Sequence, residues 1–320
     1  MKILIIYNGK IPVLHYGGTQ RVLWSEGKDL TALGHNVVYL AGKGSECPFA
    51  EVRIYDPSLP LNNQIPPDVD VIHSHVLLNT PITEKPVMFT IHGNGKPNET
   101  FDINAVFVSR NHAERHGSNQ FVPNGLDFNL LGKVNLSTPR QHLLFLGKAS
   151  RREKNLRGCI KLARRADKKL AVIGGRGFDI WGRTKYYGMI GGHKKNEVLQ
   201  KTDALLFPVR WHEPQGLAIL ESLYFGCPVF GTTYGSLPEI VHDEVGFLSN
   251  SYSELVEAIK NSGEFDRKKC HEYIVEKFNS MRMTKKYISL FEKIIAGKTL
   301  NTQLPKALIQ KKQELLPILD

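Results

Sequence analysis

The sequence predicts an α/β protein built of two doubly wound domains, and three observations lead to this prediction. Short runs rich in β-branched residues alternate with segments of helical periodicity, which is typical of parallel sheets covered by helices. The same order of strands and helices starts a second time after a polar, interrupted stretch at residues 127–140. A chain of 320 residues is also long enough for two domains of ordinary size.

The first half contains six apolar runs that we interpret as strands. They lie at residues 2–7, 35–42, 68–75, 86–93, 105–110 and 119–125. After the first run, Val22, Leu23 and Leu30 recur with helical spacing, and Gly34 follows in the position of a helix C-cap. This pattern predicts a helix over residues 19–34.

The second half repeats this order. Predicted strands lie at residues 142–148, 169–175, 184–191, 204–210 and 227–233, and predicted helices at 155–166, 216–226, 253–261 and 270–297. We expect domains at residues 1–133 and 134–297, followed by a helical tail at 298–320. Apolar residues and lysines are interspersed in the tail, which suits an amphipathic helix lying on a bilayer or packed against protein.

Composition places the chain among soluble globular proteins. No apolar run approaches the roughly 18 residues of a membrane span, and the N-terminal apolar run is too short for a signal peptide. The four cysteines are scattered without a C-x-x-C spacing, so we expect reduced thiols and a cytoplasmic location.

The net charge of +11 is unevenly distributed along the chain. Residues 1–133 hold 11 basic and 12 acidic side chains (−1), whereas residues 134–320 hold 31 and 19 (+12). A basic domain suits a phosphorylated substrate, a polyanion or an anionic membrane surface, although most basic side chains of any protein simply face water.

Candidate binding groups in the first half follow predicted strands, at the edge where open parallel sheets bind ligands. Gly17 and Gly18 precede the first helix, where glycines either let an anionic ligand approach the helix N-terminus or permit a tight turn. His92 lies at the end of a strand and either contacts a hydroxyl at this edge or serves the structure alone. The chain has neither a G-x-G-x-x-G nor a P-loop motif.

Two patterns resemble metal sites, and neither predicts one. His73 and His75 alternate on one predicted strand without an evident third ligand nearby, so hydrogen-bonded histidines are expected. Asp68 and Asp70 form a D-x-D pattern, but they precede the strand and so lie at the edge opposite the binding groups. We therefore predict no metal site.

Two lysines in the second half form a candidate phosphate site. Lys148 and Lys154 flank the turn after the strand at 142–148, so both ammonium groups could reach one diphosphate. The nearby Arg151, Arg152 and Arg157 are expected to face water.

Two glutamates accompany a predicted helix N-terminus. Glu213 lies in the loop before the helix that begins at Gly216 and Leu217, whose unpaired N–H groups could hold a phosphate. Glu221 lies inside that helix and could accept hydrogen bonds from a ribose diol. Each glutamate also has a purely structural explanation: Glu221 could lie on the helix surface, and Glu213 could be favoured by the positive end of the helix dipole. The occurrence of both glutamates around one helix N-terminus argues against these explanations.

Several motifs together carry a family resemblance. The stretch EPQGLAILESLYFGCPVFGTTYGSLPEIV resembles the donor-site signature of the retaining glycosyltransferases of family four, with two glutamates, G-x-P-V and G-x-x-P-E in order. The segments YGGTQRVLWSEGKDLTALGHNV, FVPNGLD, FLGKASRREKN and HDEVGFL resemble further parts of that family, up to about Ile295. The resemblance implies the GT-B fold, in which two Rossmann-like domains face a central cleft and a C-terminal helix crosses back to the first domain.

The resemblance also implies a role for each candidate residue. Glu213 would bind hydroxyls of the donor sugar, Glu221 the ribose, and His92 would lie at the sugar. Contacts to the donor diphosphate, without a metal, would come from Gly17, Gly18, Lys148, Lys154, Gly216 and Leu217. The base would meet Met189 and Ile190. This sequence departs from the family in having Lys148 where arginine is usual and in its short segment at residues 174–187.

The predicted function is retaining transfer of a hexosyl unit from a UDP- or GDP-sugar to a saccharide or lipid-linked acceptor, in surface polysaccharide or glycoconjugate biosynthesis. We expect no cofactor beyond that substrate, no nucleic-acid partner, and contact with an anionic membrane at its inner face, with oligomer formation left open. Two alternatives stay open, namely a nucleotide-sugar 2-epimerase of the same architecture and a non-catalytic protein that binds nucleotide sugars or polyanions.

Overall fold

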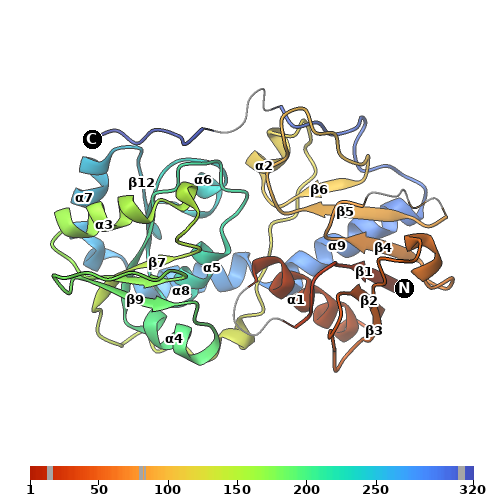
Figure 1. The fold of residues 1–320 in the computed structure, drawn as a ribbon, viewed down its shortest axis with the longest axis horizontal. Coiled ribbons are helices and arrows are strands. Elements are labelled where there is room, and N and C mark those ends of the chain that lie inside the picture. Colours follow the sequence, from red (N-terminus) through yellow and green to blue (C-terminus); the bar gives the residue numbers. More distant parts are fainter. Residues whose placement is uncertain (13–16, 79–81, 83, 309–313) are drawn as a thin grey trace. The chain divides into compact units, whose positions relative to one another are not determined.

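A computed structural model describes residues 1–12, 17–78, 82, 84–308 and 314–320, which form two compact units (Figure 1). The first unit comprises residues 1–12, 17–127 and 279–308, apart from the undescribed positions, and the second comprises residues 128–278 and 314–320. Each unit is an α/β layer structure with one parallel sheet, so the predicted fold class is confirmed.

The first unit contains a six-stranded parallel sheet in the order β3-β2-β1-β4-β5-β6. Its strands are β1 (Lys2–Ile6), β2 (Asn36–Ala41), β3 (Glu51–Ile54), β4 (Val71–Ser74), β5 (Val87–Ile91) and β6 (Ala105–Phe107). Its helices are α1 (Gly18–Ala32), α2 (Arg110–Glu114) and α9 (Ser280–Ile295), with a short 3-10 turn η1 (Leu61–Gln64). The apolar runs read from the sequence are buried in this sheet because helices cover it.

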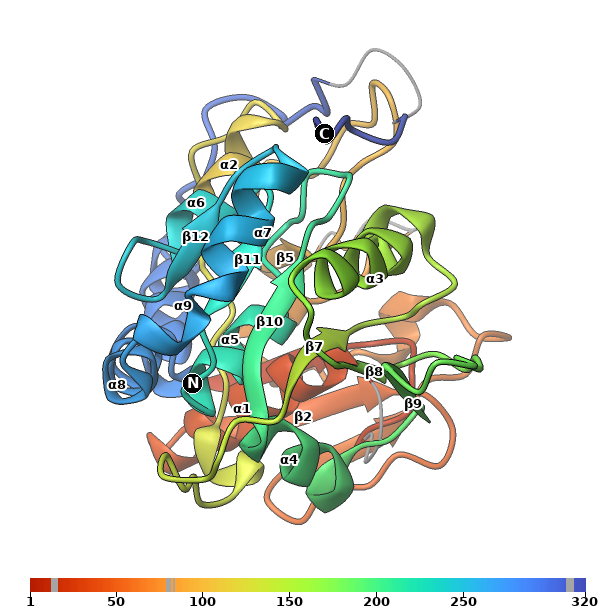
Figure 2. The same ribbon diagram turned by 90° about the vertical axis from the view of Figure 1, so that its left-hand side faces the viewer.

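The second unit repeats the same topology, with the sheet order β12-β11-β10-β7-β8-β9 (Figure 2). Its strands are β7 (His142–Leu146), β8 (Leu170–Ile173), β9 (Thr184–Gly188), β10 (Thr202–Phe207), β11 (Val229–Gly231) and β12 (Gly246–Leu248). Its helices are α3 (Leu156–Arg165), α4 (Gly192–Gln200), α5 (Leu217–Tyr224), α6 (Leu237–Ile240), α7 (Tyr252–Lys260) and α8 (Arg267–Lys277). The short 3-10 turns η2 (Phe128–Leu131), η3 (Arg152–Lys154) and η4 (Ser262–Glu264) complete it.

Each sheet has one point where the direction of strand addition reverses. In the first unit β1 pairs with both β2 and β4, and in the second unit β7 pairs with both β8 and β10. Loops that leave the carboxyl ends of such a strand pair diverge, and the space between them is where open α/β sheets bind ligands. The fold therefore predicts one ligand-binding edge in each unit.

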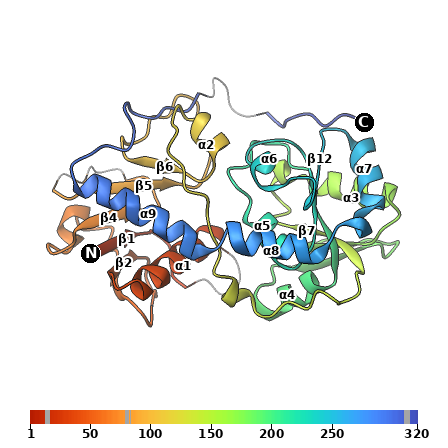
Figure 3. The same cartoon turned by 180° about the vertical axis from the view of Figure 1, so that it is seen from behind.

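The long helix predicted at residues 270–297 is interrupted in the structure. Helix α8 ends at Lys277, and α9 begins at Ser280 with Asn279 as its N-cap, whose side chain accepts a hydrogen bond from the Arg282 N–H. The chain passes from the second unit to the first at this break. Helix α9 lies beside α1 on the first sheet and buries Tyr287 and Phe291 there, so the predicted return of the C-terminal helix is confirmed (Figure 3).

Several predicted elements differ from the structure. Residues 119–125 form no strand and contribute only a single bridge, between Phe121 and Phe107, because the Pro123 ring leaves no N–H for a ladder. Strand β3 and helix α2 were not predicted. The expected boundary at residue 133 lies at 127, and the last helix belongs to the first unit rather than to residues 134–297.

The tail is not helical where the structure describes it. At residues 301–308 it is extended against the first unit, where Phe101 N–H bonds to Pro305 O and Ala307 N–H to Glu99 O. At residues 314–320 it is extended against the second unit, where Leu319 N–H bonds to Asn250 O at 2.7 Å. Part of the predicted amphipathic pattern, at residues 309–313, lies outside the described residues. Within the described part, no helix is both long and apolar enough to cross a bilayer.

Candidate functional site

The strongest pairing of predicted site residues lies at the reversal point of the second sheet. Lys154 follows β7 and Glu213 follows β10, two adjacent strands. The Lys154 ammonium lies 2.5 Å from Glu213 Oε2. Because their loops leave the same sheet edge, residues 59 positions apart in sequence meet there.

Trp211 completes this pair and was not predicted. Its indole Nε1–H donates to Glu213 Oε2 at 2.8 Å, and its ring centroid lies 4.9 Å from the Lys154 ammonium. Glu213 is only 6% exposed. Burying a carboxylate is costly without hydrogen-bond donors, and Lys154 and Trp211 supply two. The result is a fixed cation and a fixed carboxylate at the ligand-binding edge.

The backbone of Glu213 is held by Gly235, in the loop after β11. The two residues form a parallel bridge, and Ser236 N–H donates to Glu213 O at 2.9 Å. Gly235 has a φ of +71°, and a Cβ there would lie 2.3 Å from Glu213 N. No side chain fits this position, so glycine at 235 is a condition for the observed position of Glu213.

Helix α5 starts directly after this loop, as predicted. Gly216 is its N-cap with a φ of +80°, and Leu217 is its first residue. No side chain caps the helix, so its first N–H groups stay available to a ligand or to water. Glu221 lies inside α5 and is 2% exposed, and its carboxylate pairs with the ammonium of Lys195 on α4. The structure thus places Glu221 in a buried ion pair rather than on the helix surface.

The remaining predicted residues of the second unit lie at the same sheet edge. Lys148 is exposed on the turn after β7, and among the described residues its side chain forms no ion pair or hydrogen bond. Met189 and Ile190 follow β9, and Met189 is 51% exposed. Gly174 N–H bonds to Gly188 O at 2.7 Å, which joins the ends of β8 and β9 beside them.

In the first unit, the predicted residues follow β1 and β5. Gly17 is the N-cap of α1 with a φ of +151°, and Gly18 is the first helical residue, with no side-chain cap. His92 comes directly after β5 and hydrogen-bonds through Nε2 to Nδ1 of His75 at 2.9 Å. Burial, followed by the neighbouring His75 and His73, lowers the pKa of His92 well below its ordinary value, so its ring is neutral at pH 7.

His92 is the outer end of a hydrogen-bond network that centres on Glu26 of α1. Glu26 Oε2 lies 2.9 Å from His75 Nε2, and Oε1 lies 2.6 Å from His73 Nδ1. His73 Nε2 lies 2.7 Å from the Thr90 hydroxyl. Glu26, His73 and Thr90 are almost fully buried, so the network belongs to the core of the first unit.

The protonation state of Glu26 sets the tautomers along this network. Burial alone would raise the pKa of Glu26, but the charges and hydrogen bonds of His73 and His75 lower it to about 2, so it is ionised and only accepts. His73, which burial keeps neutral at pH 7 by lowering its pKa to about 4, therefore donates to Glu26 through Nδ1–H. His75 donates to the other carboxylate oxygen through Nε2–H.

The same three residues also have the composition of a metal-ligand set. Glu26, His73 and His75 each offer a ligand atom within 4.8 Å of the others, so the third ligand that the sequence did not reveal exists. Each of these atoms is engaged in a hydrogen bond inside the cluster, at distances of 2.6 and 2.9 Å. In this structure the three side chains form a buried hydrogen-bond network of the first unit.

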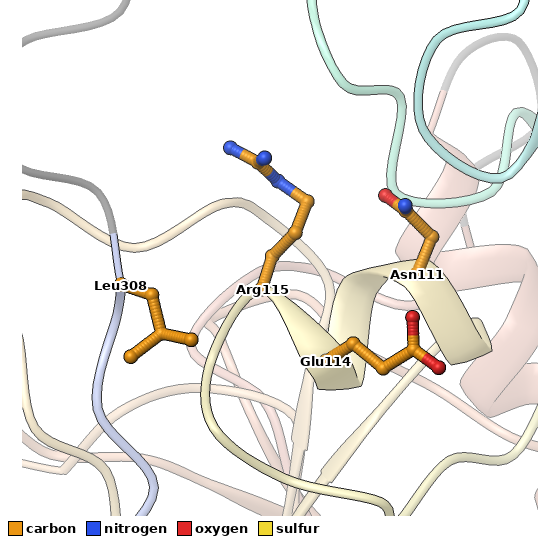
Figure 4. A pocket seen from close by; sticks show the side chains of 4 residues that line it. All are labelled: Asn111, Glu114, Arg115 and Leu308. Atoms are coloured by element: carbon orange, nitrogen blue, oxygen red, sulfur yellow. The ribbon is translucent and has the colours of Figure 1, made fainter.

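A hollow of about 380 Å³ lies elsewhere in the first unit, beside α2 and the tail (Figure 4). Asn111, Glu114, Arg115 and Leu308 line it. None of the predicted site residues contributes to it.

Comparison with known proteins agrees with this geometry. The solved glycosyltransferase structures that the chain resembles share its fold of two such units. The family model described as "Glycosyl transferases group 1" matches residues 130–274, so this segment is similar to the domains of that family. The predicted resemblance is thereby confirmed for the segment that holds Lys148, Lys154, Glu213 and Glu221.

A curated relative and several solved structures extend the comparison. An uncharacterized 41.2 kDa protein in the cps region of Klebsiella pneumoniae is 27% identical over 165 residues, which are 47% of this chain and 46% of that protein. The chain thus spans about half the length of this relative. AviGT4, a glycosyltransferase involved in avilamycin A biosynthesis, shares the fold with a TM-score of 0.77 and 19% identity, over 93% of this chain and 99% of that one. HepE from Anabaena in complex with UDP-glucose gives a TM-score of 0.66 and 16% identity, over 91% and 99%.

Sequence reasoning missed four residues that shape the site: Glu26, Lys195, Trp211 and Gly235. A signal existed for Glu26, which lies four residues from both Val22 and Leu30 on the helix face predicted to be buried. A carboxylate on such a face requires partners. Trp211 stands two residues before Glu213, but nothing local indicated which way its ring turns.

Proposed function

We propose that the chain transfers a hexosyl unit, with retention, from a UDP- or GDP-sugar to a saccharide or lipid-linked acceptor. The observation that carries this proposal is the pair formed by Lys154 and Glu213, held by Trp211 at the reversal point of the second sheet. The group 1 glycosyltransferase segment supports the reaction class, and the cps-region relative supports a role in polysaccharide or glycoconjugate biosynthesis.

In this proposal the second unit binds the nucleotide end of the donor. The Lys154 ammonium and the N–H groups at the start of α5 would take the charge of the departing diphosphate, with Lys148 reaching in from the adjacent turn. Glu213 would accept hydrogen bonds from the donor sugar and Glu221, beside Lys195, from the ribose. Met189 and Ile190 would meet the base at the end of β9.

The first unit would contribute its own groups to the donor. Gly17 and the N-terminus of α1 would approach the diphosphate, and the neutral ring of His92 would hydrogen-bond to a sugar hydroxyl. In the proposed same-face reaction, the bond from the anomeric carbon to the phosphate oxygen breaks and the bond to the acceptor oxygen forms. The acceptor proton passes to the departing phosphate oxygen. The protein then acts by positioning and by charge stabilisation.

The test of this function is nucleotide release from a panel of UDP- and GDP-sugars, with and without candidate acceptors. Release that requires an acceptor, with an α-linked product from an α-linked donor, supports retaining transfer. Release without any acceptor would point to a 2-epimerase, and tight donor binding without release to a non-catalytic binding protein. Either result would overturn the proposal.

Metal independence is a further part of the proposal, because Lys148 and Lys154 supply positive charge where a metal would otherwise be needed. We expect turnover to survive excess chelator. Complete loss of turnover in chelator, followed by recovery with manganese, would contradict this part and leave the reaction class intact.

The site of action is proposed to be the cytoplasmic face of a membrane. An acceptor that is lipid-linked has to be reached at the bilayer, and the basic excess of residues 134–320 suits an anionic surface. The tail was one candidate anchor, but a segment whose main chain bonds to protein offers no amphipathic helical face where it is described.

A further inference from the structure

The connection between β8 and β9 carries the most exposed apolar cluster of the described residues. Phe178 is 87% exposed, Ile180 72% and Trp181 68%. No other stretch of four described residues contains three large exposed apolar side chains. Single exposed apolar residues are ordinary on protein surfaces, but a cluster of them marks an interaction site.

The local fold explains why these side chains are exposed. Parallel neighbours such as β8 and β9 are usually joined by a crossover helix that packs on the sheet. Here residues 174–183 form the whole connection and contain no helix, so their apolar side chains have no sheet face to cover. Figures 1 and 2 show this green connection extending past the ends of both strands.

The exposed cluster has a defined shape. Asp179 Oδ1 accepts from Trp181 N–H at 3.1 Å, and its Oδ2 accepts from Thr184 N–H at 2.7 Å. Gly182, with a φ of +65°, donates its N–H to Asp179 O at 3.1 Å. The turn is therefore built around Asp179 and projects Phe178, Ile180 and Trp181 from fixed backbone positions.

One basic side chain contacts this cluster, and others lie on the adjoining elements. The Arg164 guanidinium lies 5.2 Å from the Trp181 ring centroid, which places the C-terminal end of α3 beside the loop. Helix α3 contains basic residues and no acidic one. Some nearby cations are paired, since Lys161 and Arg165 contact Asp320, and Arg183 contacts Asp167. Four others take part in no ion pair found among the described residues: Arg157, Arg164, Arg176 and Lys185.

We propose that the β8–β9 loop is an interfacial anchor that inserts Phe178, Ile180 and Trp181 into the headgroup region of an anionic bilayer. Apolar rings fit the boundary between headgroups and acyl chains, and the indole N–H can still hydrogen-bond there. The nearby arginines and lysines then contact anionic lipid headgroups. This binding mode does not depend on any glycosyl transfer.

Charge favours a bilayer over a second copy of the chain as the occupant. A symmetric contact through this loop would bring the same basic residues of two copies together, where like charges repel. An anionic bilayer satisfies the apolar tip and the nearby basic residues at once. The apolar side chains of the loop are also more exposed than Leu304, Leu308 and Leu319 of the tail.

The experiment is co-sedimentation of the full chain with two kinds of vesicle, phosphatidylcholine alone and equal parts phosphatidylcholine and phosphatidylglycerol. The full chain should sediment with the anionic vesicles at low salt and be released as salt rises. The variant Phe178→Ser/Ile180→Ser/Trp181→Ser should bind at least about tenfold more weakly. No binding by the full chain to anionic vesicles, or equal binding by this variant, overturns the proposal.

Three controls make the result specific. Leu130→Ser removes an exposed leucine of the same unit, 53% exposed, and should bind as the unchanged chain does. Trp181→Phe should still bind but lose the blue shift of tryptophan fluorescence that insertion of Trp181 produces. Arg176→Ser should weaken binding to anionic vesicles by about fivefold and leave neutral vesicles unaffected.

Sedimentation velocity without vesicles tests the alternative, in which a second copy of the chain binds to the loop. A monomer for both the full chain and the triple variant agrees with the bilayer as partner. A dimer that the triple variant dissociates would show that the loop joins two copies and would overturn the membrane assignment.

Discussion

Glu213 shows how a single residue gains its properties from distant segments. Its carboxylate is buried against Trp211 and the Lys154 ammonium, and its backbone rests on Gly235. Only one of these partners is near it in sequence. The sequence could indicate Glu213 and Lys154 through their positions after strands, but not that they form an ion pair.

Glu213→Gln should lower turnover by roughly 10²-fold or more, because the side chain keeps its shape but loses the charge that holds Lys154. Binding of the nucleoside diphosphate should persist, since Lys154 is still present. Steady-state kinetics with saturating donor and acceptor, together with a thermal shift by nucleotide, checks both parts. Glu244→Gln, which removes an exposed pair with Lys269, is the matched control and should leave turnover unchanged.

Gly235→Ala should reduce turnover without touching a side chain of the site. The added Cβ would lie 2.3 Å from Glu213 N and 2.4 Å from Glu213 O, so the Glu213 loop must move. We expect a loss of stability of about 1–3 kcal/mol from the strained backbone, together with a lower kcat. Gly263→Ala is a suitable control, because a Cβ there would meet nothing within 4 Å. Equal kcat for both variants would contradict this account.

At the scale of the elements, the buried network between α1 and strands β4 and β5 should make the stability of the first unit sensitive to acid. Burial lowers the pKa of His73 to about 4, although Glu26 opposes this shift, and the pKa of Glu26 itself is lowered to about 2. An unfolded histidine titrates near 6.5, so between about pH 6.5 and 4 the unfolded chain binds a proton that the folded chain does not. Stability should fall as pH falls through this window, and again below about 4.5 as the unfolded form of Glu26 protonates first.

The melting temperature measured across pH 7 to 4 tests this sign. The unchanged chain should lose stability with acid, and the double variant Glu26→Gln/His73→Asn should be less stable at pH 7 but show a flatter dependence on pH. If the melting temperature depends on pH equally in both chains, the Glu26 network is not the cause of the acid sensitivity.

The elements also show where sequence reasoning succeeds and where it does not. Strands such as β1 and β10 were predictable because most residues of each run are apolar or β-branched and are buried. The tail was predicted as a helix because its apolar spacing is compatible with one, but its main-chain hydrogen bonds to residues such as Glu99 and Asn250 favour the extended form. Partners that are distant in sequence decided this outcome.

For the whole molecule, the repeated order of strands and helices was enough to predict two doubly wound units. The boundary was not predictable to the residue, because the chain returns to the first unit at Asn279 inside what looked like one continuous helical pattern. A single Asn279 N-cap separates α8 from α9, and a cap of that kind is a weak signal in a long periodic segment.

The late return of α9 has a consequence for how the protein is made. On the ribosome, residues 1–127 emerge first but still lack α9, whose Tyr287 and Phe291 fill the core beside β4 and β5. The second unit has all six strands once residue 278 has emerged. Although domains usually fold in their order of synthesis, we expect the second unit to fold before the first.

Protease treatment of ribosome-bound chains, stalled when Phe278 has just emerged, can test this order. Fragments from residues 128–278 should survive while those from residues 1–127 are cut, whereas the released full-length chain should resist in both. Equal protection of the two segments at the stall would mean that the first unit closes without its last helix. If the expected order holds, the half of the protein made first waits, exposed to chaperones and proteases, for the half made last.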